Sequence, residues 1–133
     1  MYKEKVEKLW KLARKLDPYF QLVNSKKLMW EIRDEIDEVI EANKNNDNLE
    51  IEKELWDVFW VFQILVQKLD EEWKIDIDRM YKQIYNKIST RKSFLEEWRK
   101  VTEIEAKDIW NKAKRSEWYS EDRMWNDERV KCN

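Results

Sequence analysis

The chain has 133 residues, with 27 basic and 29 acidic side chains and a net charge of −2. It contains no glycine and no histidine, which excludes glycine-rich phosphate loops, Ser-His-Asp triads, histidine-ligated zinc and histidine-assisted di-iron sites. The balanced charge argues against a dedicated nucleic-acid-binding protein, and the single cysteine, Cys132, excludes an intrachain disulfide and fits a reducing cytoplasm.

With one proline and no glycine, the sequence predicts an all-α protein. Apolar residues at helical spacing predict a first helix over 2–16. This helix should end at Asp17, because a residue that precedes proline avoids the α conformation. We expect residues 19–24 to be irregular.

Ser25 is the expected N-cap of a second helix, over 25–42. The polar loop 43–48 should separate it from a third helix over 49–69, and a fourth is predicted over 76–91.

A further short helix is expected over 92–100. Thr102 and Glu105 have the spacing of a capping box, which predicts a last helix that ends near Arg115. We therefore assign residues 1–115 to one domain and 116–133 to a charged, tryptophan-containing tail.

The longest apolar run, 55–66, is interrupted by Asp57 and Gln63 and is too short to span a bilayer. The N-terminus has no apolar signal segment. We expect a cytoplasmic protein without membrane association.

The second helix carries an acidic residue within its apolar face. On a helical wheel, Glu35 falls between Val39 and Ala42, inside the arc of apolar residues. Glu31 and Glu38 flank it at one edge. These three acids are therefore candidates for a function that ordinary surface acids do not have.

The third helix is apolar in every direction over 54–66, as in a buried helix. Glu54 and Asp57 must then lie in or beside the core, where an unpaired charge is costly. Their i, i+3 spacing places them on one face, and Glu35 and Glu38 have the same spacing. Two such helices packed antiparallel would bring four carboxylates together.

Oxygen ligands without histidine or cysteine favour Mg²⁺, with Mn²⁺ as a substitute. The alternative is a structural ion-pair network in which Arg33 or Lys53 neutralises these acids. The spacing alone does not separate the two interpretations.

The segments WEIRDEIDEVIEA (30–42) and EKELWDVFWVF (52–62) resemble the MazG-type nucleotide pyrophosphohydrolases, members of the all-α NTP pyrophosphatase superfamily. The family pattern is E-E-x-x-E on one helix and E-x-x-D on the next. The resemblance implies a MazG-like bundle whose four-helix core is completed by dimerisation. The resemblance assigns catalysis and metal binding to Glu35, Glu38, Glu54 and Asp57. Asp34 replaces the first glutamate of the pattern and is a candidate for a supporting role. Glu31 is a second candidate for that role, because it shares the stripe of α-helical spacing with Glu35.

The segment YNKISTRKSF (85–94) resembles the family's basic stretch that contacts phosphates. It implies phosphate-binding roles for Lys87 and Arg91, one turn apart, and for Asn86, one position away from the family's asparagine. Aromatic candidates for stacking on the base are Trp10, Phe20 and Trp30.

The implied reaction is Mg²⁺-dependent hydrolysis of a (d)NTP to the monophosphate and pyrophosphate, as in house-cleaning enzymes. Three alternatives remain: a dCTP- or dUTP-specific pyrophosphatase, a phosphoribosyl-ATP pyrophosphatase, and a non-catalytic helical interaction protein. Because the third helix is apolar on more faces than one layer of helices covers, we expect a homodimer or homotetramer.

Overall fold

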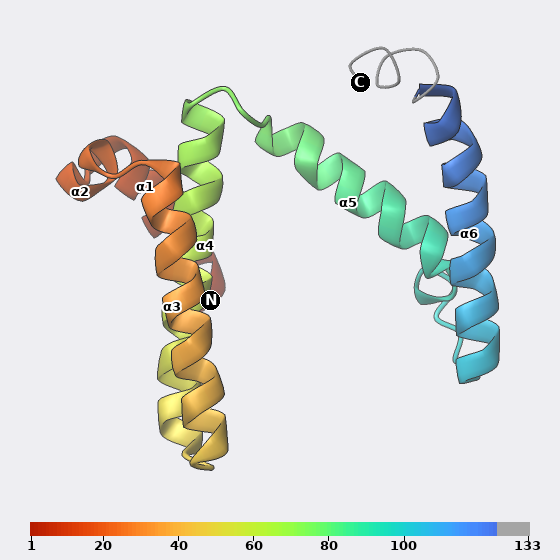
Figure 1. The fold of residues 1–133 in the computed structure, drawn as a ribbon, viewed down its shortest axis with the longest axis horizontal. Coiled ribbons are helices and arrows are strands. Elements are labelled where there is room, and N and C mark those ends of the chain that lie inside the picture. Colours follow the sequence, from red (N-terminus) through yellow and green to blue (C-terminus); the bar gives the residue numbers. More distant parts are fainter. Residues whose placement is uncertain (125–133) are drawn as a thin grey trace. The chain divides into compact units, whose positions relative to one another are not determined.

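The computed structural model describes residues 1–124, and this part of the chain contains helices and no strand (Figure 1). The predicted all-α class is confirmed. In chain order the elements are α1 (Tyr2–Leu16), α2 (Pro18–Leu22), α3 (Ser25–Lys44), α4 (Asn48–Glu71), α5 (Ile77–Arg91), the 3-10 helix η1 (Ser93–Leu95) and α6 (Glu103–Met124).

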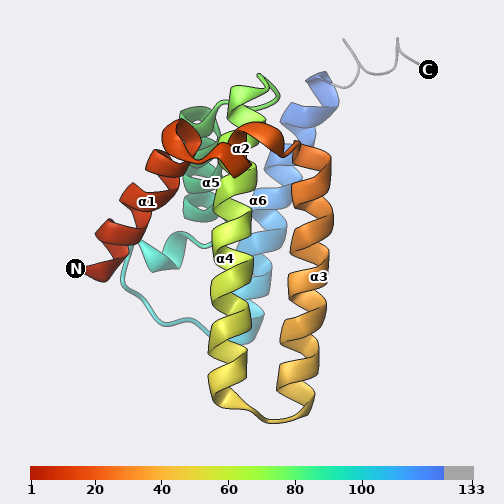
Figure 2. The same cartoon turned by 90° about the vertical axis from the view of Figure 1, so that its left-hand side faces the viewer.

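The chain folds as two compact units, Met1–Ile77 and a second that begins at Asp78. In the first unit, α3 and α4 form an antiparallel hairpin, and α1 packs against α4 (Figure 2). A buried cluster joins these helices, with Trp10, Phe20 and Leu28 at its centre. Phe20 has no exposed surface, so its truncation to alanine would remove about 3–5 kcal/mol of stability.

Side-chain caps set where the two hairpin helices begin. The Asn24 side chain accepts a hydrogen bond from the Lys27 amide at 2.8 Å, and Asp47 accepts one from the Glu50 amide at 3.1 Å. The prediction of Ser25 as the N-cap of α3 was therefore wrong by one residue. Ser25 is instead the first helical residue, where it is buried and donates its hydroxyl to Glu72 at 2.8 Å.

The expected irregular stretch after Asp17 is largely the short helix α2. The Asp17 carboxylate accepts a hydrogen bond from the Tyr19 amide at 2.9 Å, and Pro18 occupies the first helical position, where its fixed backbone favours a helix start. A residue that ended one helix thus also caps the next.

The helix expected over 92–100 is reduced to η1 and turns, whereas α6 continues to Met124, beyond its predicted end near Arg115. No proline or glycine interrupts the chain after Arg115, so nothing in its composition stops the helix. Residues 125–133 of the predicted tail, which include Cys132, lie outside the described residues.

Three residues, Asn46, Trp73 and Trp98, adopt left-handed backbone conformations with φ of 50°, 61° and 52°. After each of them, the amide of the next residue bonds to the carbonyl five positions back, as in a Schellman motif. Glycine usually occupies this position, but the chain has none. The Trp73 and Trp98 side chains are 94% and 95% exposed.

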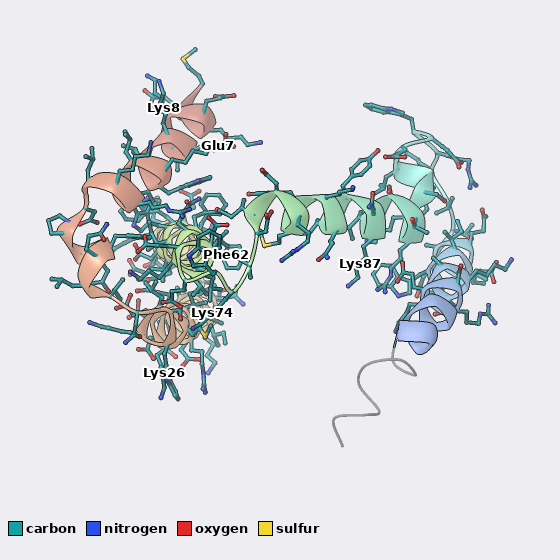
Figure 3. The ribbon with its side chains drawn as sticks, turned by 90° about the horizontal axis from the view of Figure 1, so that it is seen from above. Glu7, Lys8, Lys26, Phe62, Lys74 and Lys87 are labelled. Atoms are coloured by element: carbon teal, nitrogen blue, oxygen red, sulfur yellow. The ribbon has the colours of Figure 1, made fainter. Side chains whose placement is uncertain are left out.

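The apolar surface of α4 is not fully covered within one chain. Leu55, Phe59 and Phe62, at i, i+4 and i+7, are each about half exposed (50%, 51% and 47%); Figure 3 labels Phe62 on this helix. The expectation that one layer of helices leaves part of α4 uncovered therefore agrees with the structure. Within residues 1–124, no helix combines the length and hydropathy needed to cross a bilayer.

Candidate metal centre

Three of the four predicted acids meet between the hairpin helices. Glu35 and Glu38 come from α3 and Glu54 comes from α4, and one carboxylate oxygen of each lies within 4.8 Å of the others. The i, i+3 spacing on α3 and the antiparallel packing of α4 produce this arrangement. Glu54 is buried, Glu35 is half-buried and Glu38 is exposed at the edge.

Asp57, the fourth predicted acid, lies outside this group of oxygens. It is half-buried one turn after Glu54 on α4. Its negative charge still contributes to raising the pKa of Glu35, so the two side chains lie close enough to interact.

The cluster has the electrostatics of carboxylates brought close together. Burial, followed by the charges of Glu38 and Asp57, raises the pKa of Glu35. A hydrogen bond with Glu38, assisted by burial and by Glu50, raises the pKa of Glu54 to about 7. Each negative charge in the group therefore makes deprotonation of its neighbours less favourable.

The residues fit a divalent cation. The Oε2 atoms of Glu35 and Glu54 are buried and have no hydrogen-bond partner among the described residues, although buried polar atoms normally have one. A cation bound between them would satisfy both oxygens and remove the repulsion. An all-oxygen ligand set suits Mg²⁺ or Mn²⁺ rather than a softer metal.

The two predicted supporting acids differ in their surroundings. Asp34 is exposed. Glu31 is half-buried, and its Oε1 accepts a hydrogen bond from the Tyr19 hydroxyl at 2.5 Å. This bond, with burial and nearby negative charge, raises the pKa of Tyr19 to about 12. Sequence reasoning missed Tyr19, because nothing in the sequence indicates that α2 faces this part of α3.

The profile of the MazG nucleotide pyrophosphohydrolase domain matches residues 23–94, more than half of the chain. The chain belongs to the MazG nucleotide pyrophosphohydrolase family. Its fold is similar to the crystal structure of a mazG-related protein from Thermotoga maritima, with a TM-score of 0.78 and 26% identity over 84% of this chain and 98% of that one. No curated protein matches the chain.

The MazG segment contains the acidic cluster and also the basic residues of α5. Lys87 is exposed on this helix, where Figure 3 labels it, and Asn86 is exposed as well. Arg91 is half-buried and bound to Glu117 of α6, with 3.0 Å between Nε and Oε2, and its guanidinium lies 4.9 Å from the centre of the Trp110 ring. The Arg91 guanidinium, which was predicted to contact a phosphate, therefore binds the Glu117 carboxylate in this structure.

Of the three aromatic residues predicted to stack on a base, two are in the buried cluster of the first unit. Trp10 is 7% exposed and Phe20 is fully buried, so the predictions for both were wrong, since their ring faces pack against other side chains. Trp30 is 54% exposed, and the Arg33 guanidinium covers its ring at 4.7 Å.

Proposed function

We propose that the protein is a Mg²⁺-dependent nucleoside triphosphate pyrophosphohydrolase that converts a (d)NTP and water to the (d)NMP and pyrophosphate. Its role would be to clear the nucleotide pool of the cytoplasm. The observation that carries this proposal is the group formed by Glu35, Glu38 and Glu54 inside the MazG segment, with two buried carboxylate oxygens that lack a hydrogen-bond partner among the described residues.

Glu35, Glu38 and Glu54 would hold the cation between α3 and α4. Bound Mg²⁺ supplies charge neutralisation at the phosphates and an activated water. Asp57 is near enough to act on Glu35 by its charge, and it would accept a proton from the attacking water. Because the pyrophosphate leaves as an anion, cationic side chains near it would stabilise the transition state.

Of the two cations predicted to bind phosphate, Lys87 is exposed on α5 and would take that role. Asn86 is exposed beside it and would add a neutral donor. Arg91 would have to exchange the Glu117 carboxylate for a phosphate oxygen, which is feasible because a guanidinium binds both groups with the same bidentate geometry.

Turnover of a panel of nucleotides tests the reaction. We expect the purified chain to release phosphate from one or more (d)NTPs only when Mg²⁺ or Mn²⁺ and an added inorganic pyrophosphatase are both present, because the direct product is pyrophosphate. The panel includes dCTP, dUTP and phosphoribosyl-ATP. Absence of turnover with every nucleotide would favour the non-catalytic interaction protein, and phosphate release without the added pyrophosphatase would exclude this bond cleavage.

We also infer that two copies pair through the exposed row of α4 and so complete a four-helix core, in a homodimer or a homotetramer built from it. Phe62, 47% exposed in that row, should be covered by the second copy. A Phe62→Glu variant is expected to be monomeric by light scattering, whereas Leu22→Glu, at a position 87% exposed on α2, should leave the assembly intact. A monomeric unsubstituted chain would contradict the inference.

A further inference from the structure

The acidic face of α3 extends past the metal centre. Glu31, Glu35 and Glu38 have i, i+4 and i+7 spacing, so they share one face of the helix. Glu31 lies one turn before Glu35, about 6 Å along the helix axis. It is not part of the group of three close carboxylates. Its position is therefore beside the candidate metal centre rather than within it.

Tyr19 fixes the position of Glu31. The Tyr19 hydroxyl donates to Glu31 Oε1 at 2.5 Å, so Oε2 is left for a second donor. Tyr19 itself sits on a firmly held segment, because Asp17 caps its amide and the carbonyl of the buried Phe20 accepts a hydrogen bond from Lys68 Nζ at 3.0 Å. A carboxylate held in this way is preorganised to accept a hydrogen bond from a ligand.

The two ends of the acidic face differ in their aromatic content. Near Glu31, Tyr19 is 43% exposed and Trp30 is 54% exposed, with the Lys27 ammonium 5.7 Å from the centre of the Tyr19 ring and the Arg33 guanidinium 4.7 Å from the centre of the Trp30 ring. Toward the α3–α4 loop, residues 31–55 contain no aromatic residue at all. Within α3, an aromatic residue is thus present only at the Glu31 end, at Trp30. Nucleobases bind proteins by stacking on aromatic faces.

We propose that Glu31, oriented by Tyr19, is a specificity-determining residue for the nucleoside end of the substrate. This rests on the proposed pyrophosphohydrolase function. A carboxylate only accepts hydrogen bonds, so Glu31 Oε2 selects a nucleoside that presents a donor beside the triphosphate. The donor is an exocyclic amino group of the base or a hydroxyl of the sugar. Tyr19 is a positioning residue that acts through Glu31, and it lies before the segment that matches the MazG profile.

The test compares kcat/KM for substrate pairs that differ in one donor: CTP with UTP for the amino group, and each NTP with its dNTP for the hydroxyl. In Glu31→Gln, the preference for the donor-bearing member of one pair should fall by about 10–100-fold, the contribution of a hydrogen bond to a charged group. The substrate pair whose kcat/KM ratio changes in Glu31→Gln identifies the donor group. Glu41→Gln, on an exposed position of α3, should leave both ratios unchanged.

Tyr19→Phe keeps the ring and removes the hydroxyl, so it provides a second variant if Glu31→Gln does not fold. It should shift the same ratio in the same direction with kcat for the preferred substrate retained. Unchanged ratios in both variants, or an equal loss for every substrate, would overturn the assignment while leaving the hydrolase proposal intact. Absence of turnover by the unsubstituted chain would instead overturn the proposed function, and this inference with it.

Discussion

A Glu54→Gln variant is expected to lose about 100-fold or more of the Mg²⁺-dependent kcat, because a metal ion contributes several kcal/mol to the stabilisation of a phosphoryl transition state. The same variant should melt at a higher temperature than the unsubstituted chain in EDTA. Glutamine has the same shape and no charge, and its amide can donate to Glu38, so it relieves the repulsion that raises the pKa of Glu54 to about 7. Steady-state kinetics and thermal melts of the same samples measure both effects.

If Glu54→Gln lowers the activity but raises the melting temperature, the activity is lost because a metal ligand is missing and not because the chain is unfolded. Glu52→Gln is the matched control, because Glu52 lies two residues away on α4 but is exposed; it should keep both activity and melting temperature. If Glu54→Gln retained more than half of the activity, the assignment of the metal centre would be wrong.

The metal-free protein should become less stable as the pH rises from about 4.5 to about 7. The folded-state pKa of Glu54, about 7, lies above the usual carboxyl value of 4.5, so the folded chain binds more protons than the unfolded chain in this interval. The free energy of unfolding therefore falls through the interval and remains lower above it. Glu35, whose pKa is also raised, acts in the same direction.

Mg²⁺ should reverse this loss, and most strongly above pH 7, because the ion binds deprotonated carboxylates. At ten times its dissociation constant it would add about 1.4 kcal/mol, which corresponds to a rise of roughly 3–8 °C in melting temperature for a chain of this size. Melts at pH 5 and pH 8, with EDTA or Mg²⁺, measure the effect. Equal stabilisation by Mg²⁺ at both values, or none at pH 8, would be evidence against a cation bound by these carboxylates.

Helical periodicity was sufficient to locate α1, α3, α4 and α5 within about two residues, because each has an apolar stripe and a polar loop or proline at its ends. The same wheel placed Glu35 and Glu54 in apolar surroundings, and both are at least half-buried. Local spacing determines such features, so they can be read without tertiary contacts.

The side-chain contacts that sequence reasoning missed join residues from different helices. Tyr19 meets Glu31 only because α2 folds over the start of α3, and Arg91 meets Glu117 across 26 positions of sequence. No periodicity distinguishes an aromatic ring in the core, such as Trp10, from one that faces a ligand. Neither could the pattern show that Phe20, in a segment expected to be irregular, would be the most buried aromatic of the first unit.

The left-handed tryptophans leave the fold short of its attainable stability. For a residue with a side chain, this backbone conformation costs about 1–2 kcal/mol relative to the right-handed one, and Trp73 and Trp98 recover almost nothing by burial because both are more than nine-tenths exposed. Glycine would adopt the same turn at no such cost. Glycine at these two positions would therefore raise the free energy of unfolding by a few kcal/mol. This is a large share of the ~5–15 kcal/mol that typically separates folded from unfolded proteins.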